Sequence, residues 1–170
     1  MTATKPEPDA IPQVRPKLSD VLEAHRGERH AIAIRGFPDP DSIGSAMAHA
    51  YISMAYDIES IILYFDDISH QENRALVKKL AIEMVRYETK LDPSTIDAIV
   101  LVDAQNYGMP PGLNELPVLT VVDHHKLQLE TEAEFVDVRE DAGATCSIYS
   151  EYLYNGIAKL DRENPYCAKL

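Results

Sequence analysis

The chain has 170 residues, of which 45% are hydrophobic and 26% charged, a composition typical of one globular domain with a core. Its formal net charge of −12 argues against duplex DNA as a partner, because phosphate contacts need clustered Lys and Arg side chains. The sequence has no apolar run that could cross a bilayer and no signal-peptide pattern. The two cysteines, Cys146 and Cys167, lack the spacing of a zinc site, and we expect a cytoplasmic protein without a membrane partner.

Residues 1–16 contain four prolines and little apolar periodicity, so we expect a flexible tail there, ahead of one domain over residues 17–170. A first helix is expected at residues 18–25, where apolar side chains recur at helical spacing. Ser19 is its candidate N-cap.

The first strand is expected at residues 31–34, and it leads into a loop rich in proline and glycine. Asp39 and Asp41 lie two residues apart in this loop and could face a divalent cation from adjacent directions. Ser42 is expected to cap the helix that follows, which carries an apolar stripe over residues 46–54. In the alternative interpretation the two aspartates only cap a turn, which is common for Asp-Pro sequences.

The middle of the chain alternates between strand and helix patterns. A strand is expected at residues 58–65, and the acidic pair after it is expected to form a turn rather than a ligand site. Residues 70–80 follow a helical pattern that starts at His70, whereas residues 82–87 fit either a continued helix or a short strand.

Two later strands end in residues that can ligate metals. The strand expected at residues 97–102 is followed by Asp103, and the strand expected at residues 118–122 is followed by Asp123, His124 and His125. Open α/β sheets bind their ligands outside the carboxyl ends of the strands. Neutral imidazole binds transition metals, and a neighbouring carboxylate can share the metal or orient the ring. A short polar run after a strand is, however, also common in ordinary loops.

Acidic or histidine side chains thus follow three of the expected strands. The alternation of strands and helices predicts an α/β fold, a Rossmann-like three-layer domain with a mostly parallel central sheet of about five strands. Right-handed crossovers place the carboxyl ends of these strands along one edge. Mixed carboxylate and imidazole ligands favour Mn²⁺ or a related ion over structural zinc, and a shared carboxylate can bridge two cations that promote attack on phosphorus.

In order and spacing, the loop at residues 38–45, the pair Val102-Asp103 and the triplet at residues 123–125 resemble the first three motifs of the DHH phosphoesterases. This superfamily includes RecJ-like exonucleases, oligoribonucleases that also dephosphorylate adenosine bisphosphate, exopolyphosphatase-related proteins and family II inorganic pyrophosphatases. The resemblance covers roughly residues 32–154. Residues 143–145, which open a helix after the third motif, are most similar to the oligoribonuclease-like branch.

The resemblance implies a hydrolase in which metal-activated water cleaves phosphoester bonds. Asp39 would ligate one metal ion and Asp41 a second ion, Asp103 would bridge the two, and His124 would ligate a metal. The implied ion is Mn²⁺, with Mg²⁺ or Co²⁺ as alternatives, and the complete enzyme would hold two ions.

Three more residues receive roles from the resemblance. His125 would contact the substrate phosphate, and Asp123 would orient the two histidines. Many relatives have a metal-ligating His four residues before the first motif aspartate, where this chain has Arg35. Arginine stays protonated and cannot ligate a cation, so we expect Arg35 to bind substrate phosphate instead.

The superfamily also has a fourth motif, an aspartate well beyond the histidines, and a smaller substrate-binding domain with a glycine-rich, His-containing loop. We expect both to lie beyond Leu170, which would leave the catalytic domain incomplete at its C-terminus.

Three functions follow as alternatives. The first is Mn²⁺-dependent hydrolysis of short single-stranded oligoribonucleotides or of other small phosphate-containing nucleotides. The second is pyrophosphate or polyphosphate hydrolysis. The third is a non-catalytic metal- or nucleotide-binding module, which Arg35 and the absent fourth motif favour. A homodimer is left open.

Overall fold

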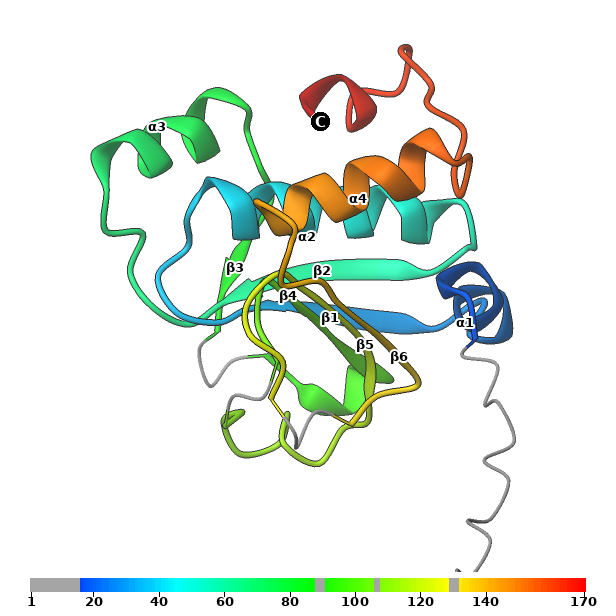
Figure 1. The fold of residues 1–170 in the computed structure, drawn as a ribbon. Coiled ribbons are helices and arrows are strands. Elements are labelled where there is room, and N and C mark those ends of the chain that lie inside the picture. Colours follow the sequence, from blue (N-terminus) through cyan, green and yellow to red (C-terminus); the bar gives the residue numbers. More distant parts are fainter. Residues whose placement is uncertain (1–15, 88–90, 106–107, 129–131) are drawn as a thin grey trace, which may run out of the picture.

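The computed structural model describes residues 16–87, 91–105, 108–128 and 132–170 (Figure 1). The tail expected at residues 1–16 lies, except for Pro16, outside the described residues. The strands are β1 (Arg29–Ile34), β2 (Glu59–Tyr64), β3 (Val85–Arg86), β4 (Ala98–Val102), β5 (Val118–Asp123) and β6 (Phe135–Val138). The helices are α1 (Leu18–Ala24), α2 (Pro40–Met54), α3 (Gln71–Lys79) and α4 (Thr145–Tyr154), with short 3₁₀ turns η1 (Pro93–Thr95) and η2 (Cys167–Lys169).

The strands form one parallel sheet in the order β3-β2-β1-β4-β5-β6, which confirms the expected α/β class. The sheet has six strands where about five were expected. The ambiguous stretch at 82–87 contributes the two-residue strand β3, and β6 is a strand that the sequence reasoning missed. From β1 the chain moves outward to β3 and then returns to β4 on the other side of β1. The carboxyl ends of β1 and β4 therefore flank the topological switch point, where open α/β sheets bind ligands.

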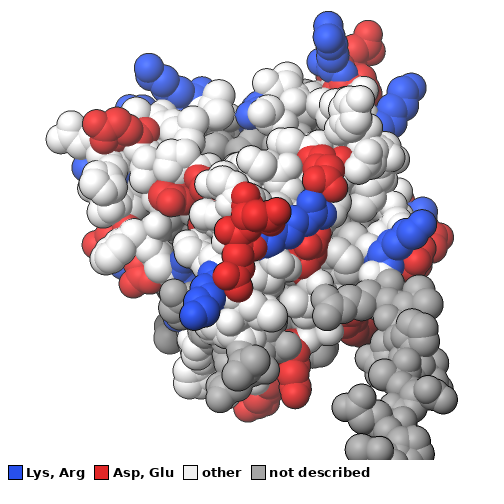
Figure 2. Space-filling model, in the orientation of Figure 1, with Lys and Arg blue, Asp and Glu red and all other residues white. Residues whose placement is uncertain are grey.

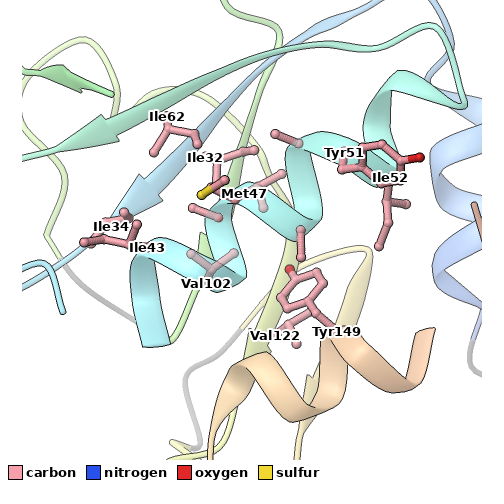
Figure 3. Packing of buried hydrophobic residues seen from close by; sticks show 14 of the residues in the cluster. Ile32, Ile34, Ile43, Met47, Tyr51, Ile52, Ile62, Val102, Val122 and Tyr149 are labelled. Atoms are coloured by element: carbon pink, nitrogen blue, oxygen red, sulfur yellow. The ribbon is translucent and has the colours of Figure 1, made fainter. Parts of the chain in front are cut away.

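One face of the sheet packs against α2 and α4 (Figure 1). Ile32 and Ile34 point to this face because alternate residues of a strand share a side. Figure 3 shows Ile32 beside Met47 and Ile34 beside Ile43, both of α2, and Tyr149 of α4 reaches toward α2 from the other helix. The Tyr149 hydroxyl lies 2.9 Å from Nδ1 of the fully buried His49, so α2 and α4 are joined by a polar contact inside the core.

The opposite face of the sheet is covered mainly by turns and loops. Ala31, Ala33, Leu101 and Val121 are buried there against side chains from the segments that surround η1 and from the loop after β4. Leu113, from that loop, is fully buried. The third layer of the domain is therefore irregular, while the helices gather on the other face of the sheet.

The starts of two helices differ from the expected caps. α1 begins at Leu18, so Lys17 rather than Ser19 is its N-cap. Asp39 is the N-cap of α2, and its Oδ1 accepts a hydrogen bond from the backbone N–H of Ser42 at 2.8 Å. Ser42 sits in the first turn and its Oγ accepts from the Asp39 N–H, because the pair forms a reciprocal capping box. His70 starts α3 as its N-cap, as expected.

Charged side chains of both signs are interspersed on the face in Figure 2, where Lys and Arg do not gather into one broad basic surface. Several of the basic side chains pair with acids; Arg86, for example, lies 2.8 Å from Asp67, one of the acidic pair after β2. Among the described residues, no helix is both long and apolar enough to cross a membrane.

Candidate metal centre at the carboxyl edge of the sheet

The Asp41 carboxylate joins the first turn of α2 to the first turn of α4. Its Oδ2 accepts a hydrogen bond from the backbone N–H of Thr145 at 2.8 Å, and its Oδ1 accepts one from the N–H of Cys146 at 2.7 Å. The first N–H groups of a helix have no partner inside the helix, and the helix dipole favours negative charge there. Each oxygen keeps a lone pair, so the carboxylate is held in place and can still ligate a cation.

The Cys146 thiol belongs to the same junction but is not activated. Burial is the main cause that raises the pKa of this thiol to about 11, so it stays protonated at neutral pH. The thiol donates to the backbone carbonyl of Asp41 at 3.2 Å. We therefore regard Cys146 as a packing residue between α2 and α4 rather than a nucleophile.

Asp103 follows β4 directly and has a backbone φ of 55°, in the left-handed region that aspartate tolerates better than most residues. Its Oδ1 accepts a hydrogen bond from the Thr145 hydroxyl at 2.9 Å. Burial, followed by the charges of Asp41 and Asp39, raises the pKa of Asp103 to about 6 although the Thr145 bond lowers it. Negative charge is therefore concentrated around Asp103, and a bound cation would offset the repulsion between these carboxylates.

One ring nitrogen of His124 faces the carboxylates of both Asp41 and Asp103. Its Nδ1 lies 3.2 Å from the carbonyl oxygen of Ala142, and because a carbonyl only accepts, Nδ1 carries a proton. In the neutral ring Nε2 then holds the lone pair, as in most metal-ligating histidines, which donate their other N–H to an oxygen. This Nε2 lies 3.6 Å from Oδ2 of Asp41 and 3.6 Å from Oδ1 of Asp103.

The Asp123 carboxylate accepts hydrogen bonds from His124 and His125. It is only 1% exposed, and its Oδ1 accepts from the His124 backbone N–H and from His125 Nδ1, both at 2.8 Å. Its Oδ2 accepts from the side-chain amide of Gln105 at 2.7 Å. The hydrogen bond to Asp123 is the main cause that raises the pKa of His125. His125 is 59% exposed, so the ring that Asp123 orients also reaches solvent.

These side chains fit a divalent cation. Carboxylate and imidazole ligands lie roughly 2.0–2.2 Å from a first-row ion, so neighbouring ligand atoms around one ion are roughly 3–4 Å apart. The separations of 3.6 Å from His124 to Asp41 and to Asp103 fall in that range. Asp103, His124 and His125 also offer ligand atoms that all lie within 4.8 Å of one another. Asp41, Asp103 and His124 are therefore brought together as the sequence predicted.

Asp39 lies at the same edge, since its charge contributes to the raised pKa of Asp103. One of its oxygens caps α2, so the turn-capping interpretation describes this residue at least in part. Its second role, as a metal ligand, stays a prediction.

Arg35 directly follows β1, and its contacts include Phe65 and Gly108. Its guanidinium lies 4.3 Å from the centroid of the Phe65 ring, and its Nη2 donates to the carbonyl of Gly108 at 3.0 Å. These contacts link the ends of β1 and β2 to the loop after β4. A role of Arg35 in binding substrate phosphate stays a prediction.

Two residues that position the centre were given no role by sequence reasoning. Thr145 is fully buried and contacts both Asp41 and Asp103, yet the sequence indicated only that a helix opens there. Gln105 donates to Asp123, and its Oε1 accepts from the backbone N–H of Gln128 at 2.8 Å. Its place two residues after Asp103 was the available signal, because a polar residue just beyond a strand end can reach the next strand.

Comparisons with known proteins find relatives in sequence and in fold. The chain is 33% identical over 116 residues to an uncharacterized protein of Methanocaldococcus jannaschii, covering 68% of this chain and 24% of that protein. It is 29% identical over 123 residues to a protein of Bacillus licheniformis described as a probable manganese-dependent inorganic pyrophosphatase, covering 71% of this chain and 39% of that protein. The chain thus spans less than half the length of these relatives.

The fold is shared with the crystal structure of an exopolyphosphatase-related protein from Bacteroides fragilis, at a TM-score of 0.60 and 14% identity. The alignment covers 80% of this chain and 42% of that chain. A family model described as the DHH family, N-terminal domain, matches residues 31–169. This match includes most of β1, every residue of the centre and α4, and the chain therefore belongs to the DHH family, of which it carries the N-terminal domain.

Proposed function

We propose that this domain binds divalent cations at the carboxyl edge of its sheet, with Mn²⁺ as the first candidate, and hydrolyses bonds to phosphorus. One observation carries the proposal: His124 Nε2 faces the Asp41 and Asp103 carboxylates at 3.6 Å each, at the switch point of the sheet. A relative described as a probable manganese-dependent pyrophosphatase supports both the metal and the reaction type.

A bound cation would supply Lewis-acid activation of water and would neutralise charge on the phosphate. The protein residues supply the remaining conditions. Asp41 and Asp103 are fixed by Thr145 and by the N-terminus of α4, so the ligand oxygens are in place before substrate binds. The exposed His125, whose pKa is raised by Asp123, is suited to contact a phosphate oxygen as a hydrogen-bond donor.

The first candidate substrates are small phosphate compounds, either short oligoribonucleotides or other nucleotide phosphates. Pyrophosphate and short polyphosphate are the second candidates, and the similarity to the Bacillus licheniformis protein favours them. The net charge of −12 supports small substrates over long nucleic acids, since a long polyanion would need an extended basic surface.

Mn²⁺ binding and substrate hydrolysis should be measured on the same protein preparations. Binding is followed by titration calorimetry, and hydrolysis is screened with pyrophosphate, short polyphosphate and short oligoribonucleotides. The variants are Asp103→Asn and His124→Ala. The control is Asp57→Asn, an exposed aspartate that precedes β2 at the other edge of the sheet and pairs with Arg26.

We expect Asp103→Asn and His124→Ala to lose Mn²⁺ affinity and hydrolysis together, while Asp57→Asn keeps both. If both centre variants bind Mn²⁺ with the same affinity as the unmodified chain, the assignment of the metal centre is wrong. If Mn²⁺ and nucleotide bind at the centre but none of the three substrate groups is hydrolysed, the domain is a binding module and the catalytic part of the proposal fails.

A further inference from the structure

We propose that His25, Glu28 and His30 form a second cation site, at the amino edge of the sheet. His25 follows α1, Glu28 precedes β1, and His30 is the second residue of β1. Figure 1 shows α1 at the end of β1 opposite to the start of α2, so this cluster is separated from the carboxyl-edge centre by the length of the strand. The ligand atoms of the three residues all lie within 4.8 Å of one another.

The three side chains converge on one carboxylate oxygen. Oε2 of Glu28 lies 2.9 Å from Nδ1 of His25 and 3.0 Å from Nε2 of His30. Two imidazole nitrogens and one carboxylate oxygen make a ligand set that Zn²⁺ accepts, with a fourth position left for water. The arrangement differs from that of the carboxyl-edge centre, where His124 Nε2 faces two carboxylates, those of Asp41 and Asp103.

Glu134 makes His25 a suitable ligand. Its Oε2 lies 3.1 Å from Nε2 of His25, on the side of the ring away from Glu28. When Nε2–H donates to this carboxylate, the neutral ring presents the Nδ1 lone pair toward Glu28 and His30. Metal-ligating histidines commonly have such an arrangement, in which a carboxylate accepts from the second nitrogen and fixes the ring.

Burial and charge also favour a cation at this point. His30 is fully buried on a central strand, whereas His25 and Glu28 are 21% and 33% exposed, so an ion could enter from one side. The nearby arginines pair with other acids: Arg26 with Glu23 and Asp57, and Arg29 with Glu59. In the described part of the chain, Glu28 and Glu134 form ion pairs with these histidines and with no Lys or Arg, so a cation that displaces the protons would meet two carboxylates.

A cation held here would join the end of α1 to β1, and Glu134, which contacts His25, connects the site to the start of β6. His25 ends the first helix, His30 belongs to the central strand, and Glu134 immediately precedes β6. The ion would therefore brace the amino edge of the sheet, and binding to the folded state alone would raise the unfolding temperature. We assign it a structural role that is separate from hydrolysis at the other edge.

The experiment uses the full chain with the carboxyl-edge centre disabled by Asp103→Asn and His124→Ala, so that this centre cannot account for the binding. Zn²⁺ is titrated by calorimetry, and the unfolding temperature is measured with and without Zn²⁺. Variants in this background are His25→Ala and Glu28→Gln, which change partly exposed side chains, and Glu134→Gln. His70→Ala, an exposed histidine that starts α3, is the matched control.

We expect one Zn²⁺ ion per chain in the disabled background, with a rise in unfolding temperature that His70→Ala keeps. Glu134→Gln should weaken Zn²⁺ binding by about 10–100-fold, the usual effect of losing a carboxylate that orients a histidine ligand. His25→Ala and Glu28→Gln, which remove ligands, should weaken it further and abolish the rise. The proposal is overturned if the disabled background binds no Zn²⁺, which would mean that hydrogen bonds alone hold the cluster. It is equally overturned if His25→Ala and Glu28→Gln bind Zn²⁺ as tightly as their background.

Discussion

Replacing Asp123 by asparagine tests how the metal centre is held in place. The Asp123 carboxylate accepts from the His124 backbone N–H and His125 Nδ1 at 2.8 Å and from the Gln105 amide at 2.7 Å. Asparagine has almost the same size but has one oxygen and one NH₂ group. In either orientation of the amide, the NH₂ group faces at least one of these donors, and that hydrogen bond is lost.

The size of the effect can be estimated from these contacts. A hydrogen bond to a charged group contributes about 1.5–3 kcal/mol, so Asp123→Asn should lower the free energy of unfolding by roughly that amount. Its effect on Mn²⁺ affinity should be about 10–100-fold, because the side chain orients the ligand histidine without touching the metal. Asp103→Asn should weaken Mn²⁺ binding more, because it removes the negative charge of the carboxylate that lies 3.6 Å from His124 Nε2.

The assay is Mn²⁺ titration calorimetry on both variants and on the unmodified chain, at one pH and with the folded fraction checked by circular dichroism. The predicted order of affinity is unmodified chain, then Asp123→Asn, then Asp103→Asn. If Asp123→Asn binds Mn²⁺ more weakly than Asp103→Asn does, then Asp123 is a ligand or Asp103 is not, and the assignment of roles is wrong.

Substitutions at three other positions, Asp39, Gly44 and His49, test α2 and its contacts. Asp39→Ala should lower the free energy of unfolding by about 1 kcal/mol through loss of the α2 cap, whereas Asp39→Asn should keep the cap and the stability. If Asp39 is also a metal ligand, both variants should bind Mn²⁺ more weakly. Unchanged Mn²⁺ affinity in both variants would mean that Asp39 acts only as the helix cap. Gly44→Ala should lower the free energy of unfolding by about 1–3 kcal/mol in a denaturant titration, because its Cβ would lie 2.7 Å from Cys146 Sγ. The double variant with Cys146→Ala should recover part of this stability. No recovery would show that the contact with Cys146 is not the cause of the loss. Burial lowers the pKa of His49 from 6.5 to about 3, so between these pH values the unfolded chain binds a proton that the folded chain does not. The free energy of unfolding should therefore fall by up to about 5 kcal/mol as pH falls from 6.5 to 3. Acid titrations of His49→Gln should show a smaller dependence of stability on pH over this range.

The central strands could be predicted because their apolar runs are continuous. Residues 31–34, 98–102 and 119–122 are buried in a parallel sheet, and such strands carry little besides apolar residues. Asp103 and Asp123 were recognisable as candidate site residues because polarity changes abruptly where these runs stop. The parallel order of the sheet then brought the strand ends together, which required only the alternation of strands and helices.

The edge strands and the contacts between distant segments could not be predicted in the same way. β3 has only two residues and β6 is only half-buried, so neither leaves a clear apolar pattern. The partner of Asp41 is the backbone of α4, 104 residues later in the chain. Backbone donors carry no signature in the sequence, so only the packing of α2 against α4 reveals this bond. The choice between Asp39 and Ser42 as cap was likewise settled by local geometry, since both residue types favour that position.

The metal centre is tested most directly by a crystal structure of the protein with Mn²⁺, with the ion located by its anomalous scattering. We predict a Mn²⁺ peak just beyond the carboxyl ends of β1 and β4. The ion should lie roughly 2.0–2.2 Å from His124 Nε2 and from a carboxylate oxygen of Asp103 or Asp41. A crystal grown at saturating Mn²⁺ with no peak among these three side chains, or with His124 Nε2 turned away from them, would contradict the assignment of the centre.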